Sequence, residues 1–335
     1  MDKEFKIAIG LLTFLLIASV LLLEFLAKIH FWNIEFVYGF APFFLLIVPY
    51  ILFSSKTFTS LLRDWSYLSF FKKLLLPVFL LLLYGVSSFW INRFDWNLFF
   101  KLGLWLMLPT LLFSIRWNET SQVHYKDFIV ALLIWIPIEI GQLSGFDIIF
   151  NENIMIPALP FAAPILGLYT FAVLRNLPGI GYTFLLQTKD LFFAGIGIIS
   201  LAFLLVPLGT YSEFIHFSIM KTSFWQAVQL ILGIYFLVAL PEELLFRGII
   251  QNILQKLLIH KKWGEWIGLG LAAIIFGLSH WNNFNPPDWH YVILASIAGG
   301  IYGWVYIKSG KTTASALVHC SVNFIWAILF KDTVG

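Results

Sequence analysis

Long apolar runs alternate with short polar segments along the whole chain. Most of these runs approach the roughly 20 residues that an α-helix needs to cross a bilayer. The pattern predicts about eleven membrane-spanning helices. They are expected at residues 5–27, 36–53, 74–91, 98–115, 127–143, 154–174, 191–211, 224–240, 267–279, 291–307 and 314–330. The expected fold class is therefore all-α, a polytopic transmembrane helix bundle.

Composition supports a membrane protein. The chain has 335 residues, of which 60% are hydrophobic and 12% are charged, and its mean hydropathy is +0.88. A soluble domain carries about 25% charged residues, so this chain has too few to cover a water-exposed surface. Lys3 and Lys6 precede a first apolar run that is too long for a signal peptide and has no small-residue cleavage site. We therefore expect a multi-pass protein of the cell (cytoplasmic) membrane, in direct contact with bilayer lipid.

Positive charge is distributed unevenly between the loops. With eleven spans and the N-terminus inside, only Lys28, Arg93, Lys221 and Lys331 fall in outside segments, and most other lysines and arginines fall inside. The positive-inside rule thus favours an N-in, C-out orientation. The net charge of +3 includes no dense basic cluster, so no nucleic-acid partner is expected. The single cysteine, Cys320, excludes an internal disulfide and a cysteine-based metal site.

The chain divides functionally rather than by a linker. Residues 1–220 contain about seven expected spans and no recognisable motif. Within residues 221–335 the polar residues inside spans become organised into three short elements. An ionisable residue inside a membrane is costly and is by default a candidate functional residue.

The first element is the segment 241–247, Pro-Glu-Glu-Leu-Leu-Phe-Arg, which directly follows an apolar helix. Glu243 and Arg247 are four residues apart on one helix face, so they are expected to form an internal ion pair that supports the structure. Glu242 points about 100° away and has no cation nearby in the sequence, so it is a candidate base. The plain alternative is an ordinary helix end at the membrane interface.

The other two elements supply imidazoles and an amide. Phe276 and His280 share a helix face, and Gly277 between them allows close approach of a neighbouring helix. His319 and Asn323 are four residues apart within the last apolar run. Either element alone could serve only to form hydrogen bonds at the membrane interface or between helices. Together with Glu242 they form a specific set of polar residues. Burying such groups in lipid costs free energy, and a shared site would offset that cost.

In this order and context the three elements resemble the CPBP family, which comprises the type II CAAX prenyl endopeptidases and their relatives in bacteriocin processing and self-immunity. The resemblance rests on Glu-Glu-x-x-x-Arg at Glu242, Glu243 and Arg247, on Phe-x-x-x-His at Phe276 and His280, and on His-x-x-x-Asn at His319 and Asn323. It covers roughly residues 220–330, and none of these motif positions departs from the family pattern.

The resemblance implies an intramembrane endopeptidase that cuts a membrane-associated or lipidated polypeptide. In the scheme it favours, Glu242 and His280 activate a water molecule, and His319 and Asn323 stabilise the oxyanion. Glu243, Arg247 and Phe276 are then structural support. Members of the family are described either as metal-dependent or as glutamate proteases without a metal. We favour the scheme without a cofactor, but Glu242, His280 and His319 could also provide a three-ligand zinc site. The sequence contains no His-Glu-x-x-His zinc motif.

Two other functions are open to the same sequence. One is a non-catalytic membrane scaffold or immunity factor of the same fold, which would have no need to keep the complete polar set. The other is a proton-coupled transporter, for which intramembrane Glu and His residues are suitable but inverted repeats would be typical, and none is apparent. The substrate and the oligomeric state are not encoded in any motif of the chain.

Overall fold

The computed structural model of the protein describes residues 2–21, 24, 34–114, 122–151, 154–284 and 287–332. The chain is mostly helical, and its packing separates two compact units, Met1–Pro178 and Gly179–Gly335. The break in packing lies before the functional boundary expected at residue 220. Helix α8 (Thr188–Tyr211) therefore packs with the C-terminal helices rather than with the N-terminal region.

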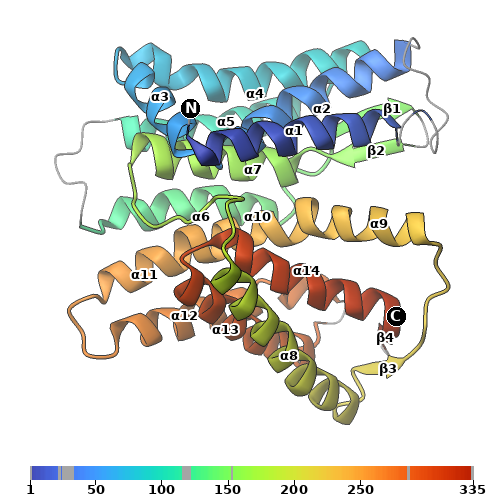
Figure 1. The fold of residues 1–335 in the computed structure, drawn as a ribbon. Helices are drawn as coiled ribbons and strands as arrows, with labels where there is room; N and C mark the ends of the chain where they lie inside the picture. Colours follow the sequence, from blue (N-terminus) through green and yellow to red (C-terminus); the bar gives the residue numbers. More distant parts are fainter. Residues whose placement is uncertain are drawn as a thin grey trace. The chain divides into compact units, whose positions relative to one another are not determined.

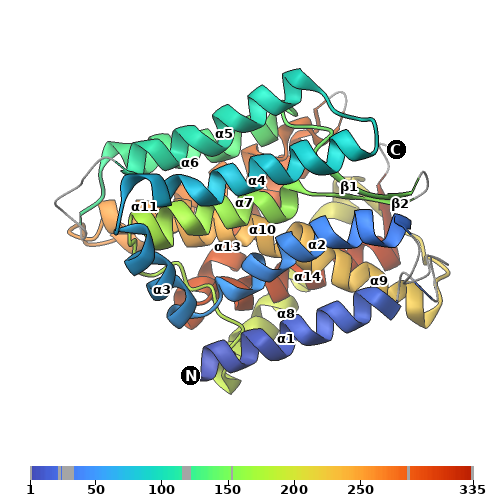
Figure 2. The ribbon, with the colours of Figure 1, turned by 90° about the horizontal axis from the view of Figure 1, so that it is seen from above.

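The first unit is a helical bundle with one short β-hairpin. Helix α4 packs along α5, and α1 packs along α2, as Figure 2 shows. Helices α2 and α3 meet at a bend of 103°, where Ser55 caps α3 by accepting a hydrogen bond from the Phe58 N–H. The elements are α1 (Lys3–Leu21), α2 (Ile34–Leu52), α3 (Lys56–Ser66), α4 (Phe70–Trp90), α5 (Trp96–Ser114), α6 (Tyr125–Glu139), β1 (Asp147–Asn151), β2 (Ile154–Pro157), α7 (Leu159–Leu168) and the π-helical η2 (Tyr169–Leu174).

The helix expected at 154–174 is wrong over its first residues, which form strand β2. Ile148 of β1 pairs with Ile156 of β2 in an antiparallel ladder. Side chains along β2 alternate between partly buried and exposed positions, which is the period of a strand rather than a helix. Pro160 then lies at the first turn of α7, where its missing N–H costs no hydrogen bond. Helix therefore begins only at Leu159.

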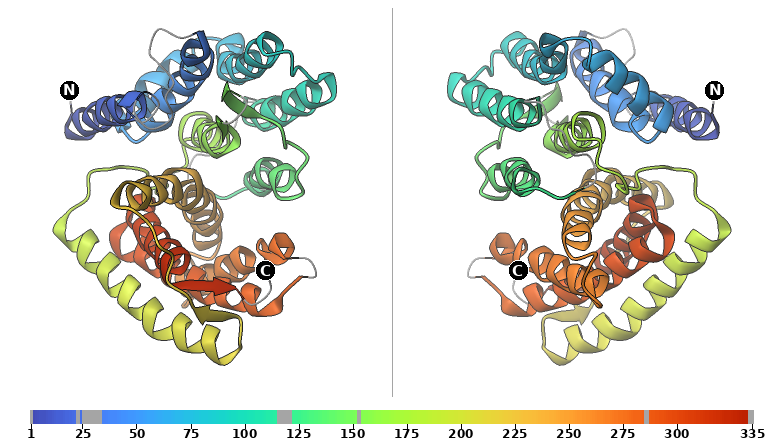
Figure 3. Two further views of the ribbon diagram at one scale, coloured as in Figure 1. Left: turned by 90° about the vertical axis from the view of Figure 1, so that its right-hand side faces the viewer. Right: turned by 90° about the vertical axis from the view of Figure 1, so that its left-hand side faces the viewer.

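The second unit places α13 against both α12 and α8, and α14 against α8 and α13. Helix α8 runs obliquely across α13 and α14 (Figures 1 and 3). The remaining elements are β3 (Ile215–Phe217), α9 (Phe224–Gly233), η3 (Ile234–Ala239), α10 (Leu240–Glu243), η4 (Leu244–Gln251), α11 (Asn252–Leu257), α12 (Gly264–Leu278), η5 (Trp281–Asn283), α13 (Trp289–Ser309), α14 (Thr312–Leu329) and β4 (Phe330–Asp332). β3 pairs antiparallel with β4.

The start of α14 is fixed by an extended segment of the same unit. The Thr312 N–H donates to the Gly181 carbonyl oxygen at 3.0 Å, and the Thr313 hydroxyl donates to the Thr183 carbonyl oxygen at 2.5 Å. Lys311 pairs with the buried Asp190 carboxylate. These bonds set where α14 begins, and hence where the side chains one and two turns further along come to lie.

Seven helices in the described part of the chain are long and apolar enough to cross a membrane, or eight if the bent α2–α3 pair is one span. Each of the eleven expected segments contains a described helix, but α6, α12 and the α7–η2 helix are shorter. The expected end of the first span at residue 27 lies outside the described residues. The longest continuous helix, Phe224–Leu257, has 34 residues. At about 1.5 Å per residue it exceeds a hydrocarbon core of about 30 Å.

Candidate active site

Glu242 and Glu243 lie on α10, a single turn of regular helix between the π-helical stretches η3 and η4. Pro241 contributes to this irregularity because it lacks an N–H and its ring clashes with the carbonyl four residues earlier. The Leu240 N–H bonds to the Tyr235 carbonyl, five residues back. The two carboxylates differ in burial: the Glu243 side chain is fully buried, whereas the Glu242 side chain is 33% exposed.

The expected ion pair between Glu243 and Arg247 is present. Arg247 Nε lies 2.9 Å from Glu243 Oε2, and both side chains are fully buried. The guanidinium also lies over two aromatic rings, at 4.7 Å from the Phe276 centroid and 5.8 Å from the Tyr302 centroid. Its two terminal nitrogens have no hydrogen-bond partner among the described residues. Cation–π contacts therefore supplement the single ion pair in stabilising this charge.

Glu243 also binds α14, which its expected role as an ion-pair partner did not include. Its Oε1 lies 3.0 Å from His319 Nδ1, and its Oε2 lies 2.5 Å from the Ser315 hydroxyl. The Ser315 hydroxyl also lies 2.8 Å from a second acceptor, the Tyr302 carbonyl oxygen. One carboxylate thus connects the guanidinium on its own helix to the imidazole on another. Glu243 orients His319 as well as balancing Arg247.

Two aromatic rings and the Glu243 carboxylate hold the His319 imidazole in place. The Tyr302 ring stacks on it with centroids 4.7 Å apart and planes 15° apart, and the Phe276 ring meets it edge-on at 5.7 Å. Only 3% of its side chain is exposed. A carboxylate accepts but does not donate, so the bond to Glu243 requires a proton on Nδ1. The other nitrogen, Nε2, points towards Glu242 and lies 3.9 Å from its Oε2.

His280 lies two residues after the end of α12 and is oriented by the main chain. Its Nδ1 lies 2.8 Å from the Phe276 carbonyl oxygen. A carbonyl oxygen only accepts, so Nδ1 carries the proton and a neutral His280 presents a lone pair at Nε2. The imidazole packs against the Phe276 ring at 4.7 Å and edge-on against Tyr291 at 5.1 Å.

Gly277 brings α12 and α13 close enough to fix this arrangement. A Cβ atom at position 277 would lie 1.8 Å from the Ser296 hydroxyl oxygen and 2.5 Å from the Val292 carbonyl oxygen. Both distances are far below van der Waals contact, and the second partner is backbone that cannot rotate away. The close approach expected from Gly277 is therefore present, and Phe276 and His280 on either side of it face α13.

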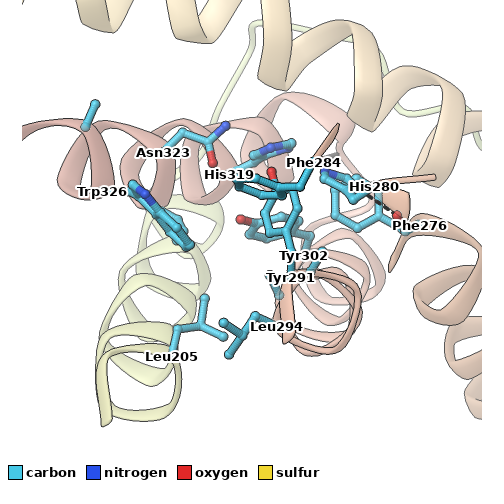
Figure 4. Close-up of a pocket in the computed structure, with 14 residues that line it drawn as sticks. Leu205, Phe276, His280, Phe284, Tyr291, Leu294, Tyr302, His319, Asn323 and Trp326 are labelled. Atoms are coloured by element: carbon cyan, nitrogen blue, oxygen red, sulfur yellow. Dashed lines mark hydrogen bonds between the residues drawn. The ribbon is translucent and has the colours of Figure 1, made fainter. Parts of the chain in front are cut away.

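His280, His319 and Asn323 line a common cavity of about 200 Å³ (Figure 4). The Asn323 amide is half-buried and has no side-chain hydrogen bond within the described residues. Glu242 does not line this cavity. Its Oε2 is nevertheless buried without a hydrogen-bond partner among the described residues, and it lies on the Nε2 side of His319. The four predicted residues therefore form two connected parts: three groups around the cavity, and one carboxylate beside His319.

The remaining walls of the cavity are mainly apolar or aromatic and come from four helical elements. They include Leu205 of α8, Tyr291 and Tyr302 of α13, and Trp326 of α14. Sequence reasoning found none of these, nor Ser315. The spacing of Ser315, one turn before His319 on the same helix face, is a signal that could have identified it. Leu205 carries no such signal, because it lies in an ordinary apolar helix.

No group of three or more His, Cys, Asp or Glu side chains among the described residues is arranged to hold a metal ion. Glu242, His280 and His319, the ligand set that the sequence allows, do not form a compact cluster. The Nδ1 atoms of both imidazoles are directed to protein oxygens, so only the Nε2 atoms remain as metal ligands. Hydrogen bonds of this kind at Nδ1 are also typical of histidines that bind zinc through Nε2.

Two imidazoles and an amide line a cavity between helices of the second unit, with a carboxylate beside one imidazole. This set of groups makes it a candidate hydrolytic site of a polytopic membrane protein. Residues 223–325 match the family model described as type II CAAX prenyl endopeptidase Rce1-like. This segment belongs to the CPBP, or CAAX, intramembrane protease family, and it contains all four predicted site residues. Searches of curated proteins and of solved structures found no match to the chain.

Proposed function

We propose that the protein is an intramembrane endopeptidase that hydrolyses a peptide bond of a membrane-associated or lipidated polypeptide. The observation that carries this proposal is that His280, His319 and Asn323 meet at one cavity, with the Glu242 carboxylate 3.9 Å from His319. The chain is a membrane protein with a CAAX-type protease domain. The proposal assigns the reaction to named side chains of that domain.

In the proposed first step, Glu242 takes a proton from water as the water oxygen attacks the carbonyl carbon. His280 orients this water, because its Nε2 lone pair accepts a hydrogen bond while Nδ1–H is held by the Phe276 carbonyl. The carbonyl π electrons move to oxygen and form a tetrahedral oxyanion. In the second step the oxyanion re-forms the carbonyl double bond and the carbon–nitrogen bond breaks. Its electron pair leaves on nitrogen, which takes the proton held by Glu242. A positioned general acid–base group contributes about 10²–10⁴-fold to rate.

His319 and Asn323 are proposed to bind the oxyanion. Asn323 supplies an amide N–H₂, which is a donor. His319 can donate from Nε2 only if it is doubly protonated, because its Nδ1 proton is already directed to Glu243. Preorganised donors in a site that excludes water stabilise developing charge far better than donors in water. Glu243 contributes by fixing the His319 ring and by balancing its charge.

The membrane arrangement is part of the proposal. We place the N-terminus inside and the C-terminus outside, with about eleven spans, of which α6, α12 and α7–η2 are the shortest. The cell membrane is the proposed location, and bilayer lipid and the polypeptide substrate are the proposed partners. The part of helix Phe224–Leu257 that exceeds the membrane thickness is proposed to project on the inner side.

The test compares two glutamate-to-glutamine substitutions with the wild-type protein. Purified wild type, Glu242→Gln and Glu265→Gln are assayed in proteoliposomes on fluorogenic peptides ending in Cys-aliphatic-aliphatic-X, prenylated and unprenylated. Glu265 is a surface residue in the first turn of α12 and serves as the control. We expect Glu242→Gln to lose at least about 10²-fold in kcat with its thermal unfolding unchanged, and Glu265→Gln to keep full activity.

The same preparations also test the metal-free scheme and the alternative functions. Stoichiometric zinc, with activity lost on chelation and restored by zinc, would overturn the metal-free scheme. Equal cleavage by wild type and Glu242→Gln would remove the base from the mechanism. If wild type cleaves no peptide of this panel, the endopeptidase proposal fails. Proton-coupled flux in the same vesicles would then favour the transporter, and its absence the non-catalytic scaffold or immunity factor.

A further inference from the structure

Tyr302 is a cavity residue that the proposed reaction has not yet used. It lies on α13, only 2% of its surface is exposed, and it lines the cavity together with His280, His319 and Asn323 (Figure 4). Its ring stacks on His319, meets Phe276 at 5.9 Å and lies under the Arg247 guanidinium. The phenol is therefore held in one place by three separate contacts.

The Tyr302 hydroxyl differs from those of three other buried tyrosines, Tyr84, Tyr169 and Tyr306, in having no hydrogen bond to any described residue. Tyr84 and Tyr169 in the first unit donate to main-chain carbonyls, at 3.4 Å and 2.8 Å. Tyr306, one turn further along α13, donates to the Gly179 carbonyl. Buried tyrosine hydroxyls usually find a partner. For Tyr302, the cavity it lines is where such a partner would be found.

We propose that the Tyr302 hydroxyl is a third hydrogen-bond donor to the carbonyl oxygen of the substrate, beside His319 and Asn323, and that it acts mainly on the oxyanion. This inference rests on the proposed function. A phenol O–H donates in its neutral state, so its contribution does not depend on the protonation of His319. A rigid donor needs no reorganisation as charge develops, which is the condition under which such donors are most effective.

The substitution Tyr302→Phe isolates the hydroxyl because it leaves the ring and its three contacts unchanged. We expect kcat to fall by about 10²-fold, as on removal of one oxyanion donor, with KM unchanged. A phosphinate analogue of the peptide, which mimics the tetrahedral state, should lose affinity by the same factor as kcat/KM. Thermal unfolding should not change, because no bond to the protein is lost.

Tyr306→Phe is the matched control on the same helix. It removes a hydroxyl that bonds to the Gly179 carbonyl, so it should lower the unfolding temperature and leave kcat of the folded protein unchanged. Wild-type kcat in Tyr302→Phe, or a change confined to KM, would overturn the inference. If Tyr302→Phe is fully active while Glu242→Gln is inactive, this inference alone fails. If wild type and Glu242→Gln do not differ, the proposed function fails as well.

Discussion

Among the residues that the structure describes, each unit buries one arginine–carboxylate pair, and the two pairs differ in their other contacts. In the first unit Arg175 contacts Asp127 through Nε at 2.7 Å and through Nη2 at 3.1 Å. In the second unit Arg247 contacts Glu243 through Nε alone. All four side chains are at most 3% exposed. Burial and charge therefore do not distinguish the two pairs.

The difference lies in what else each carboxylate binds. Asp127 Oδ2 accepts from the His124 N–H, which closes the first turn of α6, and Arg175 also donates to the Gln122 carbonyl oxygen. These bonds tie the start of α6 to Arg175, 48 residues later in the sequence, and hold the two segments together. Glu243 instead binds His319 and Ser315, more than 70 residues away in sequence, and His319 lines a cavity. A buried ion pair becomes part of a candidate site when one partner also orients a group that faces open space.

The largest effect is expected from removing either arginine. Arg175→Ala and Arg247→Ala each leave a buried carboxylate without its cation, which typically costs about 3–5 kcal/mol. Both should lower folded yield and unfolding temperature in detergent. Only Arg247→Ala should also lower the specific activity of the protein that does fold, because Glu243 then loses the bond that fixes it against His319. An Arg247→Ala protein of normal stability but without activity would instead place Arg247 in the chemistry.

A smaller effect is expected from neutralising the carboxylates while keeping their shape. Hydrogen bonds to charged groups contribute about 1.5–3 kcal/mol, so Glu243→Gln should reduce kcat by about 10–10²-fold in addition to lowering stability. Asp127→Asn should lower stability alone. Peptide cleavage per folded molecule, with thermal unfolding of the same samples, checks both. Unchanged kcat in Glu243→Gln would limit Glu243 to the structural role that the sequence predicts.

The smallest effect is expected at Ser315, whose hydroxyl lies between Glu243 and the Tyr302 carbonyl. Ser315→Ala removes one hydrogen bond, worth about 1 kcal/mol, and should lower kcat about fivefold with little loss of stability. Ser321→Ala is the control on the same helix, because that hydroxyl donates to the Leu317 carbonyl of its own helix. Equal effects of the two substitutions would show that Ser315 does not help to position His319.

Much of the fold follows from the sequence because apolar runs of membrane length have few alternatives to helix. The runs at 74–91, 191–211 and 291–307 all became helices close to their expected ends. The hairpin at Ile154–Pro157 was missed, because a short apolar run looks the same whether it continues as helix or pairs as a strand. The π-helical stretches around α10 have no periodic signature of their own.

For the candidate site, the spacing of residues within one helix predicted their contact, whereas contacts between helices could not be predicted from the sequence. The Glu243–Arg247 pair follows from positions four residues apart. The bond from Glu243 to His319 spans 76 residues and depends on where the 179–187 segment anchors the start of α14. Tyr302 and Tyr306 differ in whether the hydroxyl reaches an acceptor in the described protein, as that of Tyr306 does at the Gly179 carbonyl oxygen. Such distinctions arise only when helices pack.

The π-helical stretches on either side of α10 change how spacing along this helix must be counted. A π turn closes its hydrogen bond over one more residue than an α turn does. Each stretch therefore shifts the angular phase of every side chain that follows, in steps of about 100° per residue. Over the whole segment from Ile234 to Gln251, the direction of a side chain therefore departs from the one that regular α-helical spacing predicts. A helical wheel drawn through this region loses register with the bundle, and an alignment stays in phase only if it places the extra residues at the same turns.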